Sequence, residues 1–146
     1  MLADQAYWQY RGQVTRIKND WPSRISVLQQ PTVSAYVVLQ ALDAYRGVKA
    51  NLQAWAAVPG VVDVAKAAQQ DTGYDVIAEY QSIISSLDAA IATITTLWPQ
   101  PNGFCAHETM GAAGARSPRM FTSAQMTQVV SDAQAVLASV QNSPSE

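Results

Sequence analysis

Apolar residues spaced alternately three and four positions apart constrain this chain more than any other feature of its sequence. The longest such run reads Ile77, Tyr80, Ile84, Leu87, Ile91, Ile94, Trp98. A helix turns once in about 3.6 residues, so this spacing places the whole run on one helix face. The run predicts a helix over residues 73–97 with one buried face. Thr72 and Asp75 stand where a capping box would open it.

Three other segments repeat the pattern. Residues 3–20 carry Ala3, Tyr7, Tyr10, Val14 and Ile17, and Trp21 follows at the same spacing. Residues 32–57 carry Val37, Ala41, Tyr45, Val48, Leu52 and Trp55, and residues 123–140 carry Met126, Val130, Ala133, Leu137 and Val140. Trp21-Pro22 and Trp98-Pro99 are expected to end their helices, because proline disfavours helical backbone in the residue before it. Thr122 and Gln125 predict a capping box at the start of the last helix.

These four helices, each with a one-sided apolar face, predict an all-α fold: a four-helix bundle in a single helical domain over residues 1–146. A short extra helix is expected over residues 61–70. Residues 99–121 connect the last two long helices and are rich in turn-forming residues. Phe104–Thr109 and Ala115–Phe121 fit the two arms of a β-hairpin, and an irregular loop fits the same stretch.

The low charge of the chain bears on its partners. Charged residues make up 14% of the sequence, against about 25% in an average globular chain. Electrostatic repulsion therefore does little to oppose packing against other chains, although an ordinary alanine-rich helical protein has the same composition. The net charge of −2 gives no general attraction to nucleic acid or to acidic membranes. With one cysteine and no run of about 20 apolar residues, we expect a reducing cytoplasm, or a particle assembled there, and no membrane.

Two clusters of residues could in principle bind a metal or take part in catalysis. Cys105, His107 and Glu108 crowd within four residues without a second cluster to complete a metal site. Asp71, Asp75 and Glu79 follow one another at helical spacing, and the helix dipole accounts for acidic residues in a first turn. The sequence therefore predicts no enzyme, no catalytic residue, no metal, no cofactor and no small-molecule substrate.

Basic and aromatic residues also mix in the first helix, as in some proteins that bind nucleic acid. Tyr7, Tyr10 and Trp21 already belong to the expected core face, which leaves Trp8 as the remaining aromatic side chain. Nucleic-acid binding is therefore not predicted.

The long connection is instead predicted to dock a partner. Bundle helices are usually joined by about 2–8 residues, and longer connections tend to be functional or disordered. Its apolar and arginine residues are of interface type, and the expected docking residues are Phe104, Met110, Arg116, Arg119 and Met120.

Several stretches together resemble a known group of proteins. They are Tyr74–Tyr80, Trp98-Pro99, Gly103-Phe104 and Arg119–Gln125. In these the chain is similar, over about residues 58–140, to small helical proteins of unassigned activity encoded among the structural genes of tailed bacteriophages and prophages; Cys105–Ser117 departs from them.

The resemblance implies a virion component of the neck, tail or baseplate in several symmetric copies. Its partners would be other virion proteins and copies of itself. A cytoplasmic helical binding protein or assembly chaperone is the alternative. No functional residue is carried over from the resemblance.

Overall fold

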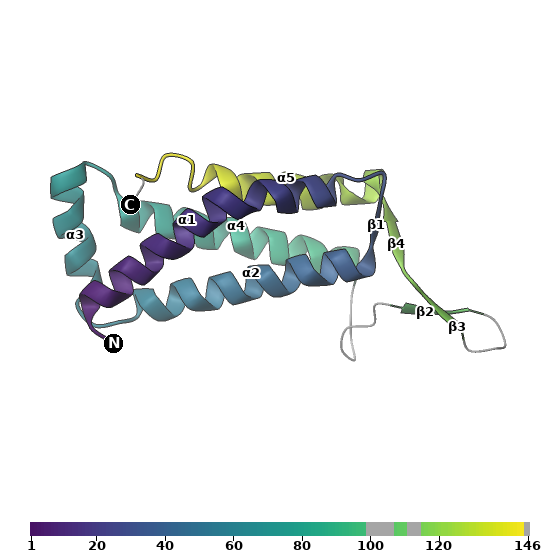
Figure 1. Cartoon of the computed structure of the whole chain (residues 1–146), viewed down its shortest axis with the longest axis horizontal. Coiled ribbons are helices and arrows are strands. Elements are labelled where there is room, and N and C mark those ends of the chain that lie inside the picture. Colours follow the sequence, from purple (N-terminus) through teal and green to yellow (C-terminus); the bar gives the residue numbers. More distant parts are fainter. Residues whose placement is uncertain (99–106, 111–114, 145–146) are drawn as a thin grey trace.

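The computed structural model describes residues 1–98, 107–110 and 115–144. Four long helices form a bundle: α1 (Ala3–Leu28), α2 (Ala35–Ala56), α4 (Val76–Leu97) and α5 (Ser123–Ala138). Helix α1 packs on α2 and α5, and α4 packs on the same two helices, so the four close a ring in which successive helices run in opposite directions (Figure 1). The predicted all-α, four-helix bundle is confirmed.

The remaining elements lie at the two ends of the bundle. Helix α3 (Val61–Thr72) crosses the end at which α1 begins, and it contacts α1, α2 and α4 (Figure 1). At the opposite end, strand β1 (Thr32–Ser34) pairs antiparallel with β4 (Met120–Thr122). A hairpin of β2 (His107–Met110) and β3 (Ala115–Pro118) projects beyond that end. Within the described residues of the long connection, the predicted β-hairpin is therefore observed, with strands at His107–Met110 and Ala115–Pro118.

The expectation that Pro22 ends the first helix is wrong. Helix α1 continues to Leu28 with the proline inside it, on the exposed side. An internal proline costs about 3 kcal/mol or more, but Trp21, Ile25 and Leu28 continue the apolar spacing and are all buried. The Trp21 indole N–H also donates a hydrogen bond of 3.1 Å to the Ala133 carbonyl of α5. Burial of these apolar side chains in about two extra turns outweighs the cost of the proline.

The second helix begins three residues later than predicted. Thr32–Ser34, expected as its first turn, is strand β1, and Ser34 is the N-cap of α2, where its hydroxyl accepts from the backbone N–H of Val37. Two further backbone bonds flank the ladder, from Ala35 N–H to the Arg119 carbonyl (2.6 Å) and from Ser123 N–H to the Pro31 carbonyl (3.1 Å).

Helix α4 is turned relative to the predicted face. Its fully buried side includes Ile83, Leu87 and Ile94, whereas Ile84 and Ile91, expected at the centre, are only partly buried. Because Leu87 and Ile94 belong to both the predicted and the observed face, the face moves by less than one residue position, roughly 60° around the helix, and α4 thereby contacts both α2 and α5.

The predicted capping box at the start of α4 is also wrong. Asp75 is itself the N-cap, and its carboxylate accepts from the backbone N–H of Ala78 at 3.0 Å. Thr72 is instead the last residue of α3, which Gly73 terminates with a φ of 74°, a conformation that favours glycine. At the start of α5 the Thr122–Gln125 capping box is confirmed, and the adjacent Phe121 and Met126 are both buried.

No helix in the described part of the chain is both long and apolar enough to cross a membrane.

Candidate functional site

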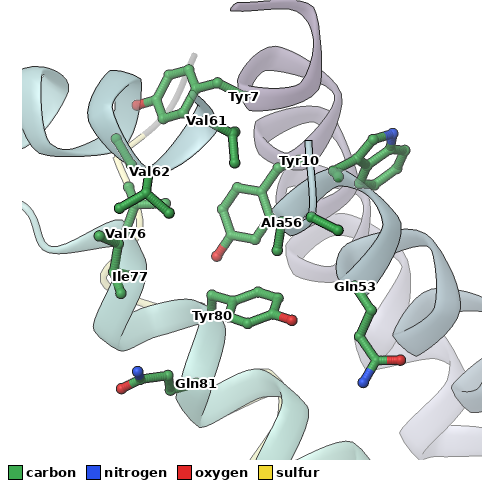
Figure 2. A pocket seen from close by; sticks show the side chains of 13 residues that line it. Tyr7, Tyr10, Gln53, Ala56, Val61, Val62, Val76, Ile77, Tyr80 and Gln81 are labelled. Atoms are coloured by element: carbon green, nitrogen blue, oxygen red, sulfur yellow. The ribbon is translucent and has the colours of Figure 1, made fainter. Parts of the chain in front are cut away.

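A pocket of about 390 Å³ opens at the α3 end of the bundle. All its lining residues are uncharged, and most are aromatic or aliphatic; they come from the start of α1, the end of α2, α3 and the start of α4 (Figure 2). Tyr10 and Tyr80 lie at its centre, with ring centroids 6.4 Å apart. Val61 and Val62 of α3 form one wall, and the amides of Gln53 and Gln81 supply polar groups. Volume and lining are typical of a site that takes an apolar group.

A buried carboxylate lies directly beside this pocket. Glu79 of α4 is 4% exposed and accepts hydrogen bonds from the hydroxyls of Tyr10, at 2.6 Å, and of Tyr74. Burial, reinforced by the Glu79 carboxylate, raises the pKa of Tyr10, and burial together with the hydrogen bond to Glu79 raises that of Tyr74. Both tyrosines therefore stay protonated at neutral pH as hydrogen-bond donors. The cluster links α1 to α4 and fixes one wall of the pocket.

The sequence analysis explained Glu79 only as an acidic residue that stabilises the start of a helix. Its spacing from Asp71 and Asp75 did not indicate that its side chain is buried. Its hydrogen-bond partners Tyr10 and Tyr74 precede it by 69 and five positions. The tyrosines in the apolar pattern could have indicated a buried carboxylate, because a buried tyrosine hydroxyl needs a polar partner.

Two cations of α1 bind the C-terminal segment over this same cluster. Arg11 is 5% exposed; its guanidinium donates to the Tyr7 hydroxyl at 3.1 Å and to the Pro144 carbonyl at 2.5 Å. The Lys18 amine donates to the Ser143 carbonyl at 2.9 Å. Two of the basic residues of the first helix thus hold backbone carbonyls of the chain's own C-terminal segment.

The predicted docking residues lie at the other end of the molecule. Met110 falls on β2, Arg116 on β3 and Met120 on β4, where Met120 pairs with Ser34 and is 50% exposed. The Arg119 guanidinium lies over the ring of Phe121, 5.3 Å from its centroid. Phe104 lies outside the described residues.

Of the residues weighed as a metal or catalytic cluster, two are described by the structure and one is not. His107 and Glu108 are on β2, opposite Pro118 and Ser117, and Cys105 lies outside the described residues. Among the residues that the structure describes, histidine, cysteine and carboxylate side chains form no group of three suited to a metal ion.

The geometry thus presents two separate features, an uncharged aromatic pocket at the α3 end and a projecting hairpin at the other.

No protein-family model, curated protein or solved structure matches this chain.

Proposed function

We propose that the chain is a non-enzymatic structural protein of a bacteriophage virion, a component of the neck, tail or baseplate present in several symmetric copies. The hairpin of β2 and β3 carries this proposal. It stands away from the end of the bundle (Figure 1), and an isolated two-stranded hairpin is marginally stable in water unless it packs on something else. A neighbouring virion protein would supply that packing.

The root of the hairpin suits it to recognition. Pairing of β4 with β1 and burial of Phe121 attach the arm firmly to the bundle. The arm sequence carries Met110, Arg116 and Met120, residue types enriched at protein interfaces. Among the described residues, β2 and β3 pair only with each other, and the outer edge of such a two-stranded ladder is also a template for strand addition by a partner. The resemblance of residues 58–140 to phage structural-module proteins supports a virion as the setting.

Particle composition tests this proposal. Particles are purified from a producing host and the chain is quantified against the major capsid protein; we expect a fixed, substoichiometric ratio. A variant with residues 105–118 replaced by a short Gly-Ser linker should keep the urea unfolding midpoint of the native chain and be absent from particles. Ala89→Arg, at an exposed position halfway along α4, serves as the control and should be incorporated normally.

Two results would contradict the proposal. Normal incorporation of the linker variant would show that the arm docks nothing. Absence of the native chain from particles, with the chain bound to capsid or tail precursors in the lysate, would indicate the assembly chaperone instead.

A further inference from the structure

Exposed apolar side chains gather at the two ends of the bundle. Of the described residues, seven large apolar side chains are exposed. Four lie at the α3 end, just before α1, in its first turns or in the first turn of α3: Met1, Leu2, Trp8 and Val62. The other three belong to the end of α1, the start of α2 and strand β4, at the base of the hairpin: Val27, Tyr36 and Met120. None of the seven lies in the middle of a bundle helix, so the exposed apolar side chains of the described residues are concentrated near the two ends.

The apolar surface at the α3 end continues into the pocket. Val62 is both exposed and part of the lining, and Trp8, 57% exposed, packs edge-on against Tyr7, another lining residue, with centroids 5.3 Å apart. A small free ligand would fill the pocket and leave Trp8 uncovered. An apolar patch that rims an apolar pocket is instead typical of a protein–protein contact.

The two ends also differ in charge. Exposed side chains at the α3 end include four carboxylates and one lysine: Asp4, Asp63, Asp71, Asp75 and Lys66. The arm, residues 107–122, carries two arginines, Arg116 and Arg119, against the single carboxylate of Glu108. An acidic end and a basic arm attract one another, whereas two acidic ends placed together repel.

We propose that copies of this chain associate head to tail, with the hairpin arm of one copy seated on the α3 end of the next and an apolar side chain of the arm in the aromatic pocket. The inference rests on the proposed function, since it names the partner of the arm. Such a contact joins two different surfaces, so it repeats from copy to copy and closes into a ring or extends as a filament.

Complementation between two variants tests this arrangement with the full chain. The first variant replaces residues 105–118 with the Gly-Ser linker and keeps its pocket. The second, Val62→Arg, keeps its arm and puts a long cation at the pocket mouth, on an exposed position that should tolerate it. Ala89→Arg adds the same charge away from both ends. The mass of each protein, and of the two variants mixed, is measured by sedimentation across a concentration series.

We expect the native chain and Ala89→Arg to form oligomers, with association weakened as salt rises from about 0.05 to 0.5 M. Each of the other two variants alone should self-associate more weakly by a factor on the order of ten or more. Their mixture should form a one-to-one heterodimer that grows no further, because it holds one intact arm and one intact pocket in contact.

Three outcomes would overturn the inference: a native chain that stays monomeric at about millimolar concentration, a linker variant that associates like the native chain, or a mixture that yields no heterodimer. A small apolar molecule retained by the monomer in native mass spectrometry, displaced by Val62→Arg, would assign the pocket to a ligand instead. Association in solution and presence in particles are measured separately. If the chain forms oligomers in solution but is absent from particles, only the proposed virion role is wrong. If the chain is present in particles but stays monomeric in solution, only the head-to-tail inference is wrong.

Discussion

Two neighbouring isoleucines on α4 provide an internally controlled measurement of how the core is packed. Ile83 is 0% exposed, whereas Ile84 is partly buried beside it. Truncating a fully buried isoleucine to alanine costs about 2–5 kcal/mol, because transfer free energy is lost and a cavity remains. Ile84→Ala removes a side chain that still contacts water, so we expect a cost of about 1–2 kcal/mol. Both substitutions change helix propensity equally, so the difference between them reports burial.

The measurement is urea unfolding followed by circular dichroism, with the free energy extrapolated to water and the dependence on urea compared between variants. An unchanged slope would show that both variants unfold from the same compact state. We expect Ile83→Ala to be less stable than Ile84→Ala by about 1–3 kcal/mol. A cost at Ile84 equal to or above that at Ile83 would refute this orientation of α4 and restore the face that the apolar spacing alone predicts.

Three further predictions follow from the buried polar groups and the arm. Glu79→Gln should destabilise the fold by about 2–4 kcal/mol, because two hydrogen bonds to a charged acceptor are weakened. Tyr74→Phe should cost roughly half as much, because only one of these bonds is lost. Urea titration should show this order, and the reverse order would contradict the prediction. Burial raises the pKa of Tyr45 to about 12, above its ordinary value of 10.0, so the folded chain keeps a proton that the unfolded chain loses. The stability this group contributes is therefore complete below about pH 10 and lost as the pH rises toward 12; Tyr45→Phe should flatten that loss, and an unchanged alkaline profile would argue against it. Cys105→Ser and His107→Ala should leave both folding and incorporation into particles intact, and stoichiometric zinc in the purified protein would contradict the absence of a metal role.

The apolar spacing predicted the number and order of the long helices because each helix contributes a continuous face to one core. It misjudged α4 because the centre of a face depends on where the neighbouring helices lie. Ile84 and Ile83 are equally apolar, and only contact with α2 and α5 decides between them. The predicted end of α1 at Pro22 was wrong for a related reason. The local backbone preference of proline indicates a helix end, but the burial of Ile25 and Leu28 outweighs that preference.

The parts that sequence reasoning missed depend on contacts between distant segments. Thr32–Ser34 is too short to show strand alternation, and its partner β4 enters near the other end of the chain. The pocket joins residues of four helices, none of which carries a polar motif that would draw attention to it. Met110 and Arg116 were chosen as docking residues because an unusually long connection is visible in the sequence itself, and their docking role stays a prediction.

The pairing of β1 with β4 determines how the molecule responds to force. Hydrogen bonds of an antiparallel ladder lie perpendicular to the strands, and β4 leads directly toward the hairpin (Figure 1). A pull on the hairpin along β4 therefore loads the bonds of this ladder together in shear instead of opening them one after another. The bond from Ala35 N–H to the Arg119 carbonyl shares that load at the arm side of the ladder. The tension then passes into α2 and α5 at once, so this joint should hold its shape under mechanical stress until the whole ladder slips in a single step.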